Sequence, residues 1–223
     1  MDNTALLVTT LIGMVACYFV CGIPFGLVIA ARDAGIDVRK VGSGNIGATN
    51  VARSAGKRAA ALTLLLDTLK GTVCVLALRL VVAAIFFGGD FAMTRPQTPF
   101  GWSSSMFFLA CVCGHVFSPY LHFHGGKGIG VGLGAGLGLC WYYALMMLAV
   151  FIVLVVPTRY VSLGSIAAAL SATLWGVVLG WPLPSIAPLA CVSAMVIWAH
   201  RVNLAKLLAG EESKFAFHKD GKE

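Results

Sequence analysis

The feature that most constrains this chain is a series of long stretches without Lys, Arg, Asp or Glu. Four such stretches occur, at residues 4–31, 100–121, 128–158 and 160–199. A fifth apolar region, 59–89, contains only three charged residues. A helix needs about 20 apolar residues to cross the hydrocarbon core of a bilayer. The sequence therefore predicts an all-α, polytopic integral membrane protein, with the whole chain 1–223 as one membrane-embedded domain and 207–223 as a short tail.

Composition supports this class and excludes others. Hydrophobic residues make up 59% of the 223-residue chain, charged residues only 11%, and the mean hydropathy is +0.89. Such a chain has too few polar side chains to cover a water-facing surface, which argues against a soluble enzyme, a disordered protein or a nucleic-acid reader. The seven cysteines all fall in apolar stretches, where we expect them to act as small hydrophobic residues. No metal-binding spacing, metal or cofactor is predicted.

The distribution of basic residues predicts the topology. They gather in the segment 32–58 and in the tail from residue 200, whereas the gap 90–99 has only Arg95. The first segment contains Arg32, Arg39, Lys40, Arg53, Lys57 and Arg58, and the tail contains Arg201, Lys206, Lys214, Lys219 and Lys222. The positive-inside rule places both segments in the cytoplasm and the N-terminus outside. The N-terminal stretch lacks the basic start of a signal peptide, so we expect it to remain as a span.

Two of the uncharged stretches are long enough for two crossings each. The prolines in 180–184 break the last one. Counting crossings then puts both ends of 128–158 in the cytoplasm, so this stretch forms either two short helices or a re-entrant loop. The prediction is about seven membrane helices, some of them short, or five plus a re-entrant hairpin.

The first candidate binding segment is the glycine-rich run 42–53 in a cytoplasmic region. Its glycines allow several backbone N–H groups to converge on one anion, side chains add donors, and an arginine can bind a phosphate through two hydrogen bonds. The candidate residues are Ser43, Gly44, Asn45, Gly47, Thr49, Asn50 and Arg53. The alternative interpretation is a flexible loop followed by a capped helix, with the arginine at the lipid headgroups.

The second candidate segment combines 114–115 with the glycine-rich run 124–130. A glycine turn that enters a helix offers free N–H groups, and a lysine adds a full positive charge. The residues are Gly125, Gly126, Lys127 and Gly128. The run lacks the spacing of a Walker A loop, so ATP hydrolysis has no support. The glycines that continue to residue 138 form two small-residue rows, which favour close helix packing.

Further polar residues lie at predicted span ends. Ser162 and Ser165 begin one span, and His200 and Asn203 end the last, three residues apart and so expected on one helix face. Asp67 and Lys70 have the same spacing, and either pair with each other or line a polar cavity. A third intramembrane charge, Arg79, has no predicted role beyond extending its side chain toward the outer interface.

The absence of other motifs narrows the reaction class. The chain has no Gly-x-Ser-x-Gly elbow and no histidine followed five residues later by aspartate. Asp67 is the one acidic residue inside a predicted span, which argues against chemistry by paired carboxylates.

Six motifs in a fixed order resemble a known family over residues 20–215. They are Ile23-Pro24-Phe25-Gly26, the run 42–53, Leu64 to Asp67 with Lys70-Gly71, Gly114-His115 with 125–128, Tyr160 to Ser165, and His200 to Asn203 with Gly210-Glu211. The chain resembles the bacterial membrane acyl-phosphate:glycerol-3-phosphate acyltransferases (PlsY).

The resemblance implies transfer of a fatty acyl group from acyl phosphate to the sn-1 hydroxyl of glycerol 3-phosphate, giving lysophosphatidic acid and phosphate. It implies a multi-pass protein of the bacterial inner membrane whose active site faces the cytoplasm, with membrane lipid but no nucleic acid as a partner. Lys127, Arg53 and His200 are the expected catalytic residues. The expected acyl-phosphate ligands are Ser43, Asn45, Thr49, Asn50 and Lys127, and those for glycerol 3-phosphate are Arg53, Ser162 or Ser165, His200 and Asn203.

Acyl phosphate has a good leaving group, so the glycerol hydroxyl can attack directly without a covalent enzyme intermediate. Its proton passes either to the donor phosphate or to His200. Glu211 is expected to hold the tail helix. The alternatives are a transporter for a phosphorylated or anionic solute, weakened by the absence of matching half-sequences, and a non-catalytic scaffold.

Overall fold

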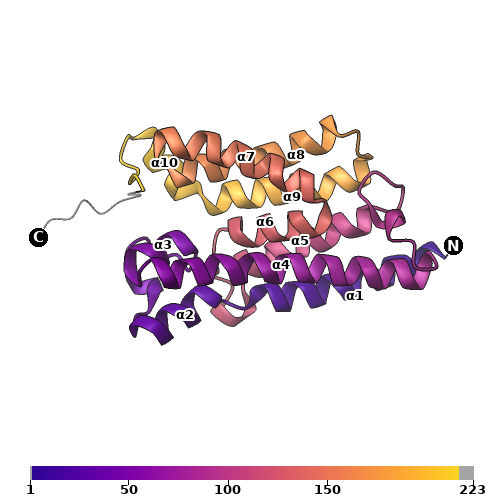
Figure 1. Ribbon diagram of the computed structural model, residues 1–223, viewed down its shortest axis with the longest axis horizontal. Coiled ribbons are helices and arrows are strands. Elements are labelled where there is room, and N and C mark those ends of the chain that lie inside the picture. Colours follow the sequence, from indigo (N-terminus) through magenta and orange to yellow (C-terminus); the bar gives the residue numbers. More distant parts are fainter. Residues whose placement is uncertain (1, 216–223) are drawn as a thin grey trace, which may run out of the picture.

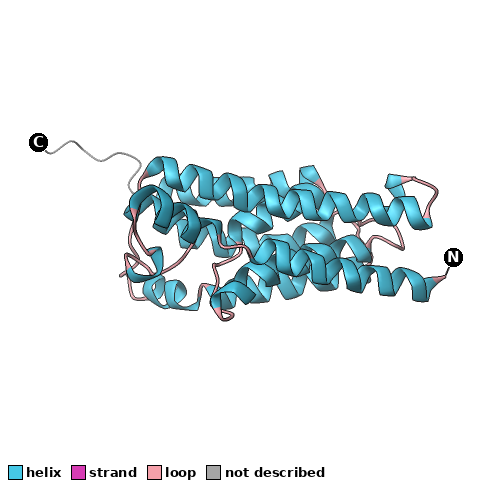
Figure 2. Ribbon diagram, turned by 90° about the horizontal axis from the view of Figure 1, so that it is seen from below, coloured by secondary structure: helices cyan, strands magenta, loops and turns pink. Residues whose placement is uncertain are grey.

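The computed structural model describes residues 2–215 and is helical along nearly its whole length (Figure 2). Ten α-helices and three short 3-10 helices follow in chain order within the described residues: α1 (Asn3–Gly22), α2 (Phe25–Ala34), η1 (Val38–Lys40), α3 (Ala48–Ser54), α4 (Lys57–Phe86), η2 (Phe91–Thr94), α5 (Trp102–Val116), η3 (Pro119–Leu121), α6 (Ile129–Leu139), α7 (Trp141–Thr158), α8 (Val161–Val178), α9 (Leu183–Ala199) and α10 (Arg201–Leu208). The tail lysines Lys219 and Lys222 lie outside the described residues.

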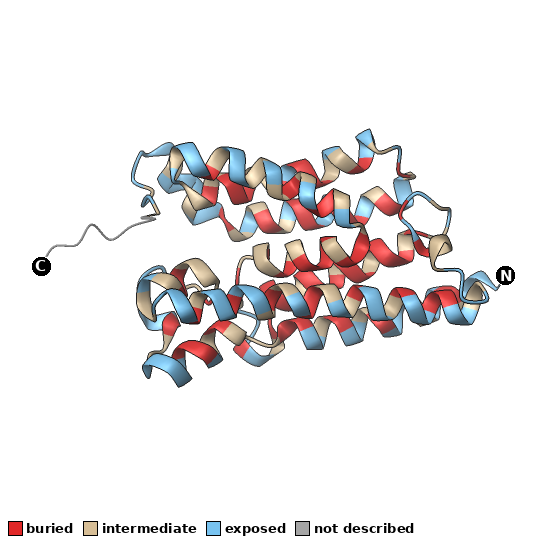
Figure 3. Cartoon of the chain, in the orientation of Figure 1, coloured by how far each residue is buried: buried red, intermediate tan, exposed pale blue. Residues whose placement is uncertain are grey.

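The long helices form two packed groups. Helices α1, α4, α5 and α6 pack together, and α7, α8 and α9 form the second group, joined to the first through contacts of α5 with α9 and α6 with α7 (Figure 1). Buried positions lie where the helices face one another, and exposed positions lie on the outside (Figure 3). Many of the exposed side chains are large and apolar. An apolar exterior is what a lipid solvent requires.

Five helical segments have the length and hydropathy of a membrane span, and a sixth qualifies if α9 and α10 count as one span. Helix α6 is apolar but has only 11 residues, roughly 16 Å of rise, about half the hydrocarbon thickness. The predicted division of 128–158 into two helices is confirmed, because α6 ends at Leu139 and α7 begins at Trp141. The predicted break at 180–184 is also confirmed, since it separates α8 from α9.

The first apolar stretch, expected as a span, forms α1 and α2, which together make one candidate span, Asn3–Ala34. Pro24 cannot donate a hydrogen bond and restricts Ile23, so α1 ends at Gly22. One expectation about helix continuity needs correction, because His200 and Asn203 do not share one helix. The chain bends by 61° between α9 and α10, with His200 at the junction.

The packing role expected for the glycine rows is confirmed where α6 meets α4. A Cβ atom at Gly134 would lie 1.9 Å from the carbonyl oxygen of Thr68, and one at Gly71 would lie 2.5 Å from that of Val131. The threonine hydroxyl of Thr72 also donates to the Gly134 carbonyl at 2.9 Å. Close backbone contact thus fixes α6 against α4.

Arg79 does not extend outward as expected. Its side chain is buried and donates hydrogen bonds of 2.7 Å to the carbonyls of Gly138 and Leu139, and one of 3.1 Å to Thr94. The last carbonyls of a helix lack intrahelical donors and carry partial negative charge. Arg79 therefore satisfies the C-terminus of the short helix α6 inside the protein.

Candidate active site

A cavity of about 360 Å³ opens between the two helix groups. Its polar lining comes from the loop before α3 with α3 itself, the segment before α6, the start of α8, the α9–α10 junction with α10, and the tail; α4 and α5 add Asp67 and His115. Its apolar lining comes from α6, α7, α8 and neighbouring helices, including Leu133, Met147 and Phe151. The cavity therefore combines a charged end with an apolar interior.

The structure brings most of the predicted site residues to this one cavity. Those that line it are Ser43, Asn45, Gly47, Thr49, Asn50, Arg53, Asp67, Lys127, Gly128, Ser162, Ser165, His200 and Asn203. Four predicted residues do not line it: Gly44, Lys70, Gly125 and Gly126. Helices α2, α3 and α10, which flank the charged end, lie at the end of the bundle opposite the N-terminus (Figure 1).

The loop before α3 is ordered by Asn50, which is 2% exposed. Its Oδ1 accepts from the backbone N–H of Ser43 at 2.9 Å, and its Nδ2 donates to the carbonyls of Val38, Val41 and Asn45. Position 42 requires glycine, because its φ is +60° and a Cβ there would lie 2.2 Å from Asn50 Oδ1. Asn50 thus uses its amide to shape the loop, which presents Ser43, Asn45 and Thr49 to the cavity.

Arg53 extends from α3 and is exposed. Within residues 2–215 it forms no salt bridge with a carboxylate, while it lines the cavity. A guanidinium group without an acidic partner is free to bind a phosphate through two parallel hydrogen bonds.

Lys127 lies across the cavity in a chain of hydrogen bonds. Its Nζ donates to Asn203 Oδ1, and Asn203 Nδ2 donates to Glu212 Oε1 at 2.8 Å. Ser162 Oγ donates to the same carboxylate oxygen at 2.8 Å. Burial lowers the pKa of Lys127 from its ordinary value, and the nearby Arg53 acts in the same direction, while Glu212 opposes both.

Glu212 is a site residue that the sequence analysis missed. The neighbouring Glu211 was expected to hold the tail, but its side chain is exposed, whereas Glu212 faces the cavity and links Ser162 to Asn203. The tail is also held by a hydrogen bond from the Phe215 N–H to the Arg159 carbonyl at 2.8 Å. In the sequence, two adjacent glutamates after a glycine do not indicate which of the two side chains faces the cavity.

His200 is buried at the bend between α9 and α10. Its Nδ1 lies 2.8 Å from the carbonyl oxygen of Val196. A carbonyl can only accept, so Nδ1 carries the hydrogen and Nε2 of the neutral ring is a hydrogen-bond acceptor. Both His200, at this junction, and Asn203, within α10, line the cavity.

The glycines before Lys127 do not offer free N–H groups. Gly125 and Gly126 donate theirs to the carbonyls of Val116 and His115 at 3.0 Å each. A Cβ at Gly126 would lie 2.2 Å from His115 Nε2. These glycines therefore pack the segment against the end of α5, and only Gly128 and Lys127 reach the cavity.

Asp67 and Lys70 form the predicted pair, with Lys70 Nζ 2.6 Å from Asp67 Oδ1. Lys70 also donates to the Ile23 carbonyl at 2.8 Å and lies 3.2 Å from His115 Nδ1. The ammonium group thus adds a second hydrogen bond to the Ile23 carbonyl at the break between α1 and α2, which already accepts from the Phe25 N–H at 3.1 Å. Asp67 and His115 form part of the cavity wall, and Lys70 supports them from behind.

Fold and cavity together define a class: a helical membrane protein whose cavity has cationic groups at one end and an apolar interior. Residues 11–210 match the family model described as glycerol-3-phosphate acyltransferase. The chain is 41% identical over 216 residues to the glycerol-3-phosphate acyltransferase of Brucella anthropi, covering 96% of this chain and 98% of the relative. It is 37% identical over 202 residues to that of Aquifex aeolicus, covering 91% and 97%.

A crystal structure of PlsY, described as an integral membrane glycerol 3-phosphate acyltransferase in its glycerol 3-phosphate form, superposes with a TM-score of 0.80. It is 36% identical in sequence, and the match covers 93% of this chain and 96% of PlsY. The lysophosphatidic acid form of PlsY gives a TM-score of 0.77. The chain belongs to the membrane glycerol-3-phosphate acyltransferase family.

Proposed function

We propose that this chain transfers a fatty acyl group from acyl phosphate to the sn-1 hydroxyl of glycerol 3-phosphate, releasing lysophosphatidic acid and inorganic phosphate. The observation that carries this proposal is the single cavity in which Arg53 and Lys127 lie at one end and apolar side chains of α6, α7 and α8 form the other. Both substrates have a phosphate, and the donor also has an acyl chain. One recess therefore provides what both molecules need.

The groups around the cavity suggest how the substrates divide between them. We assign acyl phosphate to Ser43, Asn45, Thr49 and Lys127, with its chain directed between the helices. We assign glycerol 3-phosphate to the other group, which contains Arg53, Ser162, Ser165, His200 and Asn203. The Asn50 amide, already used within the loop, supports the first group without binding substrate directly.

The reaction then needs no enzyme nucleophile. The sn-1 oxygen attacks the acyl carbonyl carbon, the carbon–oxygen bond to phosphate breaks, and phosphate leaves with the electron pair. The attacking hydroxyl loses its proton either to His200 Nε2, which is an acceptor in the neutral ring, or to the departing phosphate. Lys127 and Arg53 stabilise the negative charge that develops on the phosphates, and the hydrogen bond from Lys127 to Asn203 holds the ammonium group in place before the reaction.

The topology proposed here keeps the N-terminus outside, the C-terminus in the cytoplasm and the cavity open to the cytoplasmic face of the bacterial inner membrane. Seven helices cross or enter the bilayer, with α6 as the short one. The supporting observation is that α2, α3 and α10, which carry Arg32, Arg53, Arg201 and Lys206, share one end of the bundle (Figure 1). Reporter fusions after Arg159 should be cytoplasmic and fusions after Arg95 external; the opposite result rejects this orientation.

Purified protein in detergent tests the activity directly. With palmitoyl phosphate and glycerol 3-phosphate together we expect stoichiometric release of phosphate and formation of lysophosphatidic acid, whereas either substrate alone should give only background. A folded, monodisperse sample that forms no lysophosphatidic acid overturns the proposal. Uptake of labelled glycerol 3-phosphate into proteoliposomes without acylation would favour the transporter instead.

A further inference from the structure

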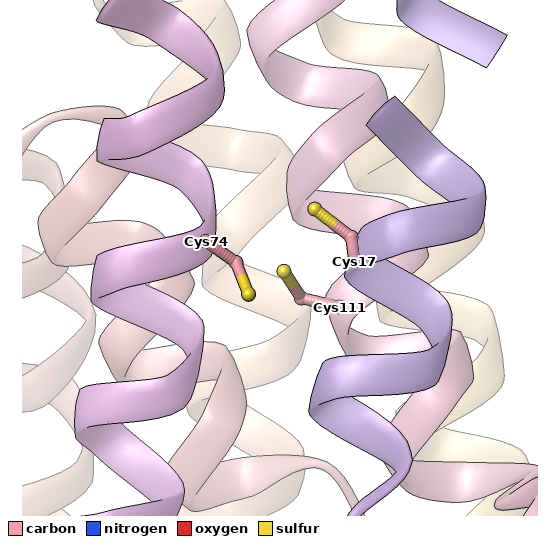
Figure 4. Close-up of side chains that lie close together, drawn as sticks. All are labelled: Cys17, Cys74 and Cys111. Atoms are coloured by element: carbon pink, nitrogen blue, oxygen red, sulfur yellow. The ribbon is translucent and has the colours of Figure 1, made fainter. Parts of the chain in front are cut away.

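Three cysteine side chains from three different helices meet inside the first helix group. Cys17 lies on α1, Cys74 on α4 and Cys111 on α5, and their sulfur atoms all lie within 4.8 Å of one another (Figure 4). No spacing in the sequence predicts this cluster, because metal-binding motifs are recognised within one short segment. All three cysteines are free, and none of them lines the substrate cavity.

The surroundings of the cluster restrict what it can bind. Cys17 and Cys111 are fully buried among apolar residues of the core, and Cys74 is half-buried and connects the cluster to the outside of the bundle. No histidine or carboxylate belongs to the group within the described residues. A set of sulfur ligands in apolar surroundings selects soft metal ions and disfavours magnesium, calcium and manganese.

The number of ligands separates the soft ions from one another. Structural zinc sites are almost always tetrahedral with four protein ligands, one more than this cluster provides. In a trigonal site with three sulfur ligands, metal–sulfur bonds of about 2.3 Å place the sulfurs about 4 Å apart. The spacing found for the three thiols suits the trigonal arrangement. Cys21, one turn further along α1, interacts with Cys74 and Cys111 but is not a member of the close group.

We propose that Cys17, Cys74 and Cys111 form a binding site for a monovalent soft cation, Cu(I), which joins α1, α4 and α5. Binding replaces thiol protons by metal–sulfur bonds, and the protons pass to solvent. No electron is transferred. The site is separate from the acyl-transfer cavity, and its occupation does not depend on the proposed reaction.

Anaerobic titration of the purified, reduced protein with Cu(I), in competition with a chromophoric Cu(I) chelator, tests this site. We expect the wild-type protein to retain one Cu(I) per chain, with only sulfur neighbours at the copper in X-ray absorption and a higher melting temperature. Zn(II) under the same conditions should not be retained. Cys191→Ala removes an exposed thiol on α9 and serves as the matched control, which should bind as the wild type does.

The cluster variants should lose the ion. Cys74→Ser changes the half-buried thiol with little change in volume, so it is the variant least expected to disturb folding, and its Cu(I) affinity should fall at least tenfold. The triple variant Cys17→Ala/Cys74→Ala/Cys111→Ala should retain none, with monodisperse elution as the check on folding. The proposal is overturned if wild-type protein with titratable thiols retains no Cu(I), if Cys74→Ser binds as tightly as wild type, or if Zn(II) is retained in place of Cu(I).

Discussion

The hydrogen bonds of Glu212 make the tail a functional part of the cavity, and this leads to a quantitative prediction. Glu212 accepts from Ser162 and from Asn203, and Asn203 in turn accepts from Lys127. Replacing Glu212 by alanine therefore releases the amide that orients the lysine. We predict that Glu212→Ala lowers the catalytic efficiency while the protein stays folded.

The magnitude follows from the two hydrogen bonds to the carboxylate. Hydrogen bonds to charged groups contribute about 1.5–3 kcal/mol each, and solvent competition at a half-buried group reduces this to about 1 kcal/mol. A combined loss of about 2 kcal/mol corresponds to a roughly 30-fold lower kcat/KM. Glu212→Gln keeps an acceptor oxygen but loses the charge, so its loss should be several-fold smaller.

The pH profile gives a second measure. A lysine whose pKa lies below the ordinary value is fully charged below that pKa and loses its charge as the pH rises through it. Glu212 raises the pKa of Lys127 against the effects of burial and Arg53. Without Glu212 the pKa of Lys127 falls further, and the alkaline limb of kcat/KM should move to lower pH.

Phosphate release measured over a range of glycerol 3-phosphate concentrations and pH values tests both expectations. Glu211→Ala is the matched control, since this adjacent glutamate is exposed and has no side-chain hydrogen bond within residues 2–215. Combining Glu212→Ala with Asn203→Ala should cost less than the sum of the two single losses. Equal losses for Glu211→Ala and Glu212→Ala, or full additivity with Asn203→Ala, would refute the reasoning.

Three further predictions concern other parts of the structure. Arg53→Lys keeps the charge but loses the paired donors, so KM for glycerol 3-phosphate should rise about tenfold, and unchanged kinetics count against two-point phosphate binding. His200→Ala should lower kcat about 100-fold if Nε2 takes the proton; a raised KM with retained kcat assigns the proton to the donor phosphate. Gly134→Ala should destabilise the protein by about 1–3 kcal/mol, because its Cβ would lie 1.9 Å from the Thr68 carbonyl oxygen. Gly132→Ala is the control, since its Cβ would have no neighbour nearer than 3.9 Å. Equal melting temperatures of the two variants in detergent would contradict this packing.

Much of the helical arrangement was predictable because the bilayer constrains it so strongly. Apolar length gave the main helices, the prolines after Gly180 gave the break before α9, and counting crossings gave the division of 128–158. The same count placed 42–53, Lys127, Ser162 and His200 at one face, and the structure brings residues from all four segments to one cavity. Topology thus predicted the site more fully than any single motif.

Contacts between distant segments account for what was not predicted. The bend at His200 has no proline or glycine to announce it, and it becomes visible only where α9 ends and α10 turns away. Glu211 and Glu212 are equivalent as sequence, and only the path of the tail distinguishes them. The cysteine cluster likewise depends on three helices whose mutual rotation no local pattern reveals.

The short helix α6 links Arg79, the buried arginine of α4, to the cavity. Because α6 has only 11 residues, it cannot run the full thickness of the bundle, and its two ends must be satisfied inside the protein. Arg79 satisfies the carbonyls at one end, and at the other the left-handed Gly128, with φ of +83°, leads from Lys127 into the helix. A longer α6 would carry Lys127 outward, away from the apolar interior where an acyl chain fits. The buried arginine therefore allows the cationic end of the cavity to lie next to its apolar part.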